Sequence, residues 1–135
     1  MDNQSLISRI KALKLPDKQY MVCGSAILQI LGIRPAQDID LLVSPELFIE
    51  LKEKRGWKTH PNYQTTIDSP NHDAGAKQTM DFMKQNYTLA DILPTAYWYE
   101  DIPFMNLEKL IDAKTQLNRE KDILDLNLIQ KYLAR

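Results

Sequence analysis

Two aspartates interrupt a run of residues that otherwise favours a β-strand, and this run constrains the fold more than any other feature. The run spans residues 38–43 and reads DIDLLV. Aspartate is disfavoured in strands, whereas isoleucine and valine favour them. Because side chains alternate along a strand, Asp38 and Asp40 point to one face of the sheet and the isoleucine between them to the other. The run therefore predicts a strand with an apolar face and a face that carries two carboxylates.

A carboxylate pair of this kind points to a bound cation. Two carboxylates held side by side repel each other unless a cation or a proton lies between them. A divalent cation with oxygen ligands is the simplest occupant. Mg²⁺ fits because it needs few carboxylates and completes its coordination with phosphates and water. We therefore expect Asp38 and Asp40 to bind Mg²⁺.

A glycine-serine pair lies upstream of the aspartates. Gly24 and Ser25 stand between an expected strand over Gln19–Cys23 and a short helical stretch over Ala26–Leu31. A glycine at a strand-to-helix turn allows close backbone approach, and free amides at a helix start favour a phosphate. A metal-binding carboxylate pair beside such a turn is typical of phosphoryl or nucleotidyl transfer, in which the protein positions groups and neutralises charge.

The remaining patterns predict a mixed α+β fold. Ser44-Pro45-Glu46 is a strong helix start, and apolar residues at helical spacing precede residue 16 and follow residue 106. The expected elements are helices over residues 6–13, 45–54 and 107–117, a last helix with the stripe Leu124, Leu128, Ile129 and Leu133, and strands over 63–67, 78–83 and 102–105, with a turn-rich stretch over 68–75. This order predicts a single domain over residues 1–135, with a mixed sheet, flanking helices and two C-terminal helices.

Composition excludes several classes of function. The 135 residues include 17 Lys and Arg against 18 Asp and Glu, a net charge of −1, so the chain gives no general nucleic-acid signal and no polybasic membrane anchor. It begins without the pattern of a signal peptide, and no apolar run approaches the ~20 residues that span a bilayer. The single cysteine, Cys23, cannot form an intramolecular disulfide. We expect a cytoplasmic protein without a membrane partner.

The two motifs together carry a family resemblance. Gly24-Ser25, twelve intervening residues and Asp38-Ile39-Asp40 resemble the nucleotidyltransferase superfamily of DNA polymerase β. The longer pattern, with the C-terminal run over residues 107–126, is similar to bacterial minimal nucleotidyltransferases and to abortive-infection nucleotidyltransferase toxins. The resemblance implies a nucleotidyltransferase-like fold. It also implies Mg²⁺-dependent transfer of a nucleoside monophosphate from an NTP to an acceptor hydroxyl on a small molecule, an RNA end or a protein.

The resemblance also implies a third carboxylate on a later strand, which helps to bind the metal and can act as a base. Asp81 fits best, since it lies in the expected strand over residues 78–83. Asp68 and Asp73 are alternatives in turn-rich sequence. The resemblance further implies that Gly24 and Ser25 hold the phosphates.

Several basic residues leave two interpretations open. Arg34 either contacts phosphate or braces the carboxylates. Arg119 and Lys121 either reach the triphosphate or pair with acidic neighbours, Asp122 and Asp125, on an exposed helical face, and for Lys114 such pairing is the preferred interpretation. The alternative function is a catalytically inactive binding module, such as one half of a toxin–antitoxin pair. Because a chain of 135 residues leaves little room for a dedicated acceptor domain, a protein partner or a second copy is expected to complete the acceptor side of the enzyme.

Overall fold

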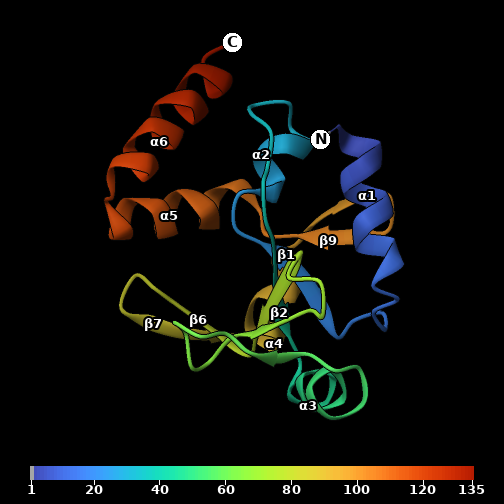
Figure 1. Cartoon of the computed structure of the whole chain (residues 1–135). Coiled ribbons are helices and arrows are strands. Elements are labelled where there is room, and N and C mark those ends of the chain that lie inside the picture. Colours follow the sequence, from blue (N-terminus) through green and yellow to red (C-terminus); the bar gives the residue numbers. More distant parts are fainter. Residues whose placement is uncertain (1) are drawn as a thin grey trace.

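The computed structural model describes residues 2–135, and Phe82 by its backbone alone. Within these residues the chain has a mixed α+β fold built on a seven-stranded sheet (Figure 1). The helices are α1 Asn3–Ala12, α2 Ala26–Ile30, α3 Pro45–Lys54, α4 Leu89–Ile92, α5 Leu107–Leu117 and α6 Glu120–Leu133. The strands are β1 Tyr20–Cys23, β2 Ile39–Val43, β3 Lys58–Thr59, β4 Ile67–Asp68, β5 Ala74–Lys77, β6 Thr79–Phe82, β7 Gln85–Thr88, β8 Tyr97–Tyr99 and β9 Ile102–Phe104.

The main sheet has the strand order β3-β4-β5-β2-β1-β9-β8, and β6 and β7 form a separate hairpin. β2 runs antiparallel to β1 and parallel to β5, while β4 runs antiparallel to β5. The register places Cys23, Asp40, Gly75 and Asp68 in one row across four neighbouring strands. Because directly opposed residues share a face of the sheet, the row brings two carboxylates to the same face with a glycine between them.

The local signals at the ends of the helices act as the sequence predicts. The Ser44 hydroxyl accepts a hydrogen bond from the backbone N–H of Leu47 and caps α3. Asn118 adopts the left-handed conformation (φ 51°) and separates α5 from α6. The first helix differs in one detail, since Asp2 caps it and it begins at Asn3. The expected strands at 19–23, 39–43 and 102–105 are confirmed as β1, β2 and β9.

The middle of the chain differs from its prediction. The stretch over residues 63–67 is mostly a turn, and only Ile67 and Asp68 form strand β4. The expected turn-rich stretch over 68–75 ends in β5, which lies in the centre of the sheet directly beside β2. β5 consists of two alanines, a glycine and a lysine, residues that are scarce in strands, so propensity did not indicate it.

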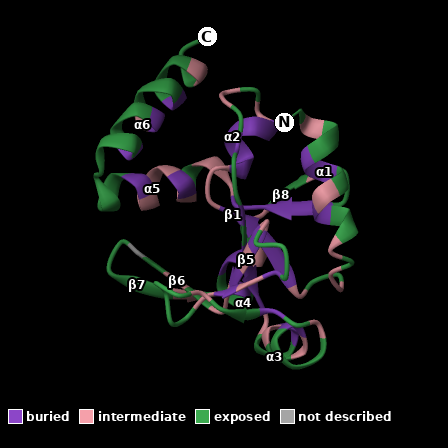
Figure 2. Ribbon diagram, viewed as in Figure 1, coloured by how far each residue is buried: buried purple, intermediate pink, exposed green. Residues whose placement is uncertain are grey.

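The core surrounds β1, β2 and α2, whereas α6 is largely exposed (Figure 2). Along α6 the described buried residues are Asp122, Asp125 and Ile129. The expected apolar stripe on this helix is therefore only partly buried: Ile129 packs in the core, but Leu124 is 60% exposed and Leu133 58%. None of the helices within residues 2–135 has the length and apolarity needed to cross a membrane.

Candidate functional site

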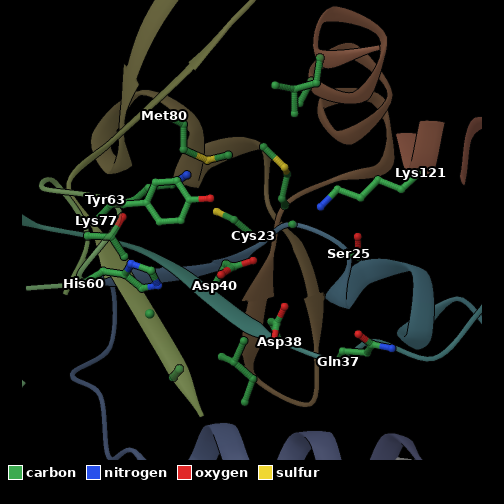
Figure 3. Close-up of a pocket in the computed structure, with 18 of the residues that line it drawn as sticks. Cys23, Ser25, Gln37, Asp38, Asp40, His60, Tyr63, Lys77, Met80 and Lys121 are labelled. Carbon is green, nitrogen blue, oxygen red and sulfur yellow. The ribbon is translucent and has the colours of Figure 1, made fainter. Parts of the chain in front are cut away.

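A cleft of about 1100 Å³ opens over the face of the sheet that carries the carboxylate row. Strands β2, β4 and β5 supply its floor, and the turn between α5 and α6 supplies one wall. Figure 3 shows Asp38 and Asp40 extending from β2 and its entry into this space, with Lys121 reaching in from one side. Tyr63 and His60 lie on the other side. The expected placement of Asp38 and Asp40 on a common face is confirmed.

Gly24 lies directly against the Asp40 carboxylate. Its φ is +65°, and a Cβ built on it would lie 2.9 Å from Oδ2 of Asp40. The turn therefore has two reasons to contain glycine: the left-handed backbone conformation and the space that the carboxylate fills. Ser25 follows, and its hydroxyl accepts a hydrogen bond of 3.0 Å from Arg34. The close approach joins the two sequence motifs into one site.

Asp40 has an electrostatic environment that disfavours its charged form. Loss of hydration at the base of the cleft raises its pKa, and the charge of Asp38 adds to this effect. Lys77 and Lys121 act in the opposite direction. A cation between the two carboxylates would relieve both unfavourable effects. The oxygen donors of the pair suit Mg²⁺, which is satisfied by two carboxylates when phosphate oxygens and water complete its coordination.

Asp81 does not join this site, so the expectation of three converging acids is wrong. It lies on the β6–β7 hairpin, where it is exposed and accepts a 2.5 Å hydrogen bond from the side chain of Asn86. Its neighbour Met80 points into the cleft, and alternation along the strand turns Asp81 away. Among residues 2–135, no three His, Cys, Asp or Glu side chains are grouped closely enough to hold a metal without other ligands.

Asp68 takes a position in the cleft that the sequence left only as an alternative. It lines the cleft two strands away from Asp40, across Gly75. A Cβ at Gly75 would be in ordinary contact with Oδ1 of Asp68, at 3.5 Å, so this carboxylate lies directly beside the glycine. Asp73, the other alternative, also lines the cleft, but its Oδ1 accepts a 2.7 Å hydrogen bond from the Ser69 hydroxyl.

His60 orients toward Asp68 in one tautomer. The backbone N–H of Asn62 donates to Nδ1 of His60 over 3.0 Å, so in the neutral ring Nε2 carries the hydrogen. Nε2 lies 3.9 Å from Oδ2 of Asp68, within ion-pair range but longer than a hydrogen bond. Sequence analysis did not single out His60 for this site, because it lies in polar, loop-like sequence without any recognisable motif.

A buried ionic network supports the wall of the cleft. Arg34 donates to both carboxylate oxygens of Asp125, over 2.6 and 2.7 Å. Lys114 lies 2.8 Å from Asp125 and 3.5 Å from Asp122. The expected pairing of Lys114 is confirmed, but its expected location is wrong, since Lys114 is 7% exposed. The hydrogen bonds of Arg34 hold Asp125 and Ser25. Its two expected roles, toward a phosphate or toward Asp38 and Asp40, stay predictions.

Arg119 and Lys121 lie at the same wall of the cleft but differ in their contacts. The Arg119 guanidinium binds Asp122 through Nε and Nη2, at 2.7 and 3.2 Å, which is the pairing alternative. These bonds and that of Lys114 hold the Asp122 pKa at about 2. Lys121 points into the cleft, and its charge acts on Asp40 (Figure 3). Lys121 is therefore the better placed of the two to meet a phosphate.

Cys23 lies beside the carboxylates but has no reactive character. It is 1% exposed, and burial raises its pKa to about 12. The thiol therefore stays protonated and acts as a small core residue.

Comparison of the chain with protein-family models, with curated proteins and with solved structures finds no match. The function must therefore be inferred from the arrangement of the site.

Proposed function

We propose that the protein is a nucleotidyltransferase that transfers a nucleoside monophosphate from an NTP to an acceptor hydroxyl, with Mg²⁺ as its cofactor. One observation carries the proposal: the Asp40 carboxylate fills the space beside Gly24, where a Cβ would lie 2.9 Å from its Oδ2, in a cleft that Asp38 also lines. This contact unites the glycine-serine turn and the Asp-x-Asp strand, the motifs that resemble the DNA polymerase β superfamily.

The cleft offers complementary groups for such a substrate. Asp38 and Asp40 would hold Mg²⁺, which when bound neutralises phosphate charge and polarises the reacting phosphoryl group. Lys121 and Lys77 bring positive charge to the same space, as shown by their action on Asp40. Transfer of a phosphoryl group depends mainly on positioning and charge stabilisation, so these groups match its requirements.

Asp68 is the group we assign to receive the acceptor proton, in place of Asp81. It lines the cleft beside Gly75, and Nε2 of His60 lies 3.9 Å from its carboxylate. A carboxylate oriented by a second residue and open to a substrate is suited to general-base chemistry. His60 is then a positioning residue.

Labelling separates an active enzyme from a binding module. We expect the protein, incubated with Mg²⁺, each α-labelled NTP and cell RNA, protein and metabolites, to label one acceptor class. We expect Asp68→Asn to reduce labelling by about 10²–10⁴-fold, the usual contribution of a general base, with little change in NTP affinity. Asp81→Asn is the matched control and should leave labelling unchanged. Equal losses in the two variants would remove the assignment of Asp68, and labelling in no fraction despite NTP binding would contradict transfer.

A pair of glycine variants tests the contact between the motifs. Gly24→Ala and Gly32→Ala each place a Cβ at positive φ, 65° and 77°, and each should lower the free energy of unfolding by about 1 kcal/mol. Only Gly24→Ala meets Asp40, whereas nothing lies within 4 Å of a Cβ at Gly32. We therefore expect only Gly24→Ala to lose Mg²⁺-dependent NTP binding by calorimetry. Equal binding by both variants would show that the contact with Asp40 does not matter.

Exposed apolar side chains favour a second candidate, a binding module with a protein partner. Leu117 and Leu124 on α5 and α6, and Trp98 on the edge strand β8, are 54%, 60% and 55% exposed. Apolar exposure of this kind is typical of interaction surfaces. A partner or a second copy bound there is also compatible with catalysis, so this surface alone does not separate the two candidates. The labelling experiment separates them, because only the enzyme transfers the label.

A further inference from the structure

We propose that the cleft binds the nucleobase of its substrate between the ring of Tyr63 and the guanidinium face of Arg119. This inference rests on the proposed function, which makes the substrate an NTP. It assigns a part of the site that neither the carboxylates nor the lysines account for. The two residues come from distant parts of the chain, the β3–β4 hairpin and the turn before α6.

Tyr63 presents an aromatic ring at the mouth of the cleft. The ring is 63% exposed, although the residue lines the cleft (Figure 3). Backbone hydrogen bonds fix the hairpin tip: His60 N–H donates to the Thr66 carbonyl over 2.8 Å, and Thr66 N–H donates to the Tyr63 carbonyl over 3.1 Å. The His60 ring supports Tyr63 at a centroid distance of 4.8 Å. A large exposed ring on a fixed backbone is a preorganised stacking surface.

Arg119 presents a second flat surface. Its two hydrogen bonds to Asp122 lie in the plane of the guanidinium and fix that plane, while the side chain is 50% exposed. Donors used in this way are no longer free for a triphosphate, but the faces of the guanidinium are. Arginine faces stack on aromatic rings and on bases. The fixed plane therefore offers a face for stacking, beside the phosphate contact that the sequence left open.

Both residues line the same cleft, Tyr63 from the β3–β4 hairpin and Arg119 from the turn before α6. The phosphate end is set by Asp40 on β2 and by Asp38, which directly precedes this strand, and β5 separates β2 from the β3–β4 hairpin. With strands about 4.8 Å apart, the β3–β4 hairpin lies roughly 10 Å or more from β2. An NTP is long enough to span from the carboxylates to the mouth of the cleft.

Stacking predicts a defined pattern of affinity. Every base has a π-face, so a clamp of this kind accepts purines and pyrimidines with modest preference. A compound with the triphosphate but without the base should bind through Lys121, Lys77 and the metal alone. The difference between the affinity for the NTP and the affinity for this compound measures the contribution of the clamp.

Calorimetry with Mg²⁺ and two probes tests the clamp. The probes are inorganic tripolyphosphate and the NTP that binds most tightly among the four ribonucleotides. We expect Tyr63→Ala to weaken NTP binding about tenfold, Tyr63→Phe to retain it, and tripolyphosphate binding to stay unchanged in both. Arg119→Lys keeps the charge beside Asp122 but removes the flat face, so it should also weaken only the NTP. Tyr97→Ala, an exposed tyrosine on the far edge strand β8, is the matched control.

Each other outcome overturns the clamp in a recognisable way. Unchanged NTP affinity in Tyr63→Ala, or equal wild-type affinity for NTP and tripolyphosphate, would exclude nucleobase stacking while leaving the proposed function intact. Loss of tripolyphosphate binding in Arg119→Lys would show that Arg119 binds the phosphates and not the base. Binding of neither probe by the wild-type protein would overturn the proposed function together with the clamp.

Discussion

Replacing Asp40 with asparagine is expected to abolish Mg²⁺-dependent nucleotide transfer while the protein stays folded. Asn cannot supply the negative charge that the cation requires. Loss of a residue that only supports a metal ligand can lower activity by roughly 100-fold, so loss of the ligand itself should lower activity at least as much. Labelling with an α-labelled NTP measures the loss. Asp81→Asn, the same substitution at an exposed position outside the cleft, should retain full activity.

The same substitution, Asp40→Asn, should leave the thermal stability of the protein unchanged or raise it, although it abolishes activity. The folded-state pKa of Asp40 is raised, first by lost hydration and then by Asp38, so its contribution to stability is largest at low pH and is lost as pH rises through that pKa. At neutral pH the charged carboxylate therefore destabilises the apo protein, and Asp40→Asn should match or exceed the wild type in thermal unfolding. Mg²⁺ should stabilise the wild type alone. Marked destabilisation of the variant would identify a structural ion pair instead of a metal site.

The parts of the fold that follow strong local signals could be predicted from the sequence. β2 combines β-forming residues with alternation, and Ser44-Pro45 fixes the start of the next helix. β5 could not be predicted in the same way. Its residues Ala74-Gly75-Ala76-Lys77 have little intrinsic preference for a strand, and they form one because β2 and β4 flank them in the sheet. Tertiary context decides such a segment.

The wrong assignment of Asp81 follows from this missed strand. The residues over 79–82 do form a strand, as predicted, but β5 occupies the place beside β2, and β6 pairs with β7 instead. Alternation correctly separated Met80 from Asp81, but only the topology decides which of the two faces the cleft. Asp68 lies in the site because Gly75 pairs with Asp40 on one side and with Asp68 on the other. This pairing depends on how three strands are arranged in the sheet, which the alternation of residues along one strand does not reveal.

The ionic network was also only partly predictable from the sequence. The spacing of Lys114, Asp122 and Asp125 correctly indicated pairing along the C-terminal helices, but an exposed helical face was expected. The network is buried because Arg34, 91 residues earlier, closes it from the opposite side. A contact at this separation leaves no local signal. Arg34 thereby links Ser25 to α6, and so connects the glycine-serine turn with the wall that bears Lys121.

Removal of Asp125 is expected to cause a large loss of stability. Asp125→Ala leaves Lys114 buried without this partner and frees both donors of Arg34 that Asp125 now accepts. Breaking a buried ion pair from one side costs about 3–5 kcal/mol, a large part of the stability of a domain this size. Urea unfolding measures the change. Asp81→Ala, which removes an exposed aspartate, should stay within about 0.5 kcal/mol of the wild type.

The decrease in the free energy of unfolding at low pH provides an independent test of the ionic network. Burial opposes ionisation of Asp125, yet hydrogen bonds from Arg34 and Lys114 outweigh it and lower the pKa, and the pKa of Asp122 falls to about 2. Both carboxylates therefore contribute stability above their ordinary pKa that is lost as pH falls through the lowered values. Asp125→Ala should flatten this decline between about pH 4 and pH 2.

A paired substitution keeps the prediction testable if the single variant fails to fold. Asp125→Leu with Lys114→Met replaces the buried charges by apolar groups and should recover much of the lost stability, because uncompensated charge is the main cost. If Asp125→Ala instead lost under about 1 kcal/mol, the network would behave as a surface pair. The wall that carries Arg119 and Lys121 would then owe its position to the apolar packing of Ile129 and not to the charges.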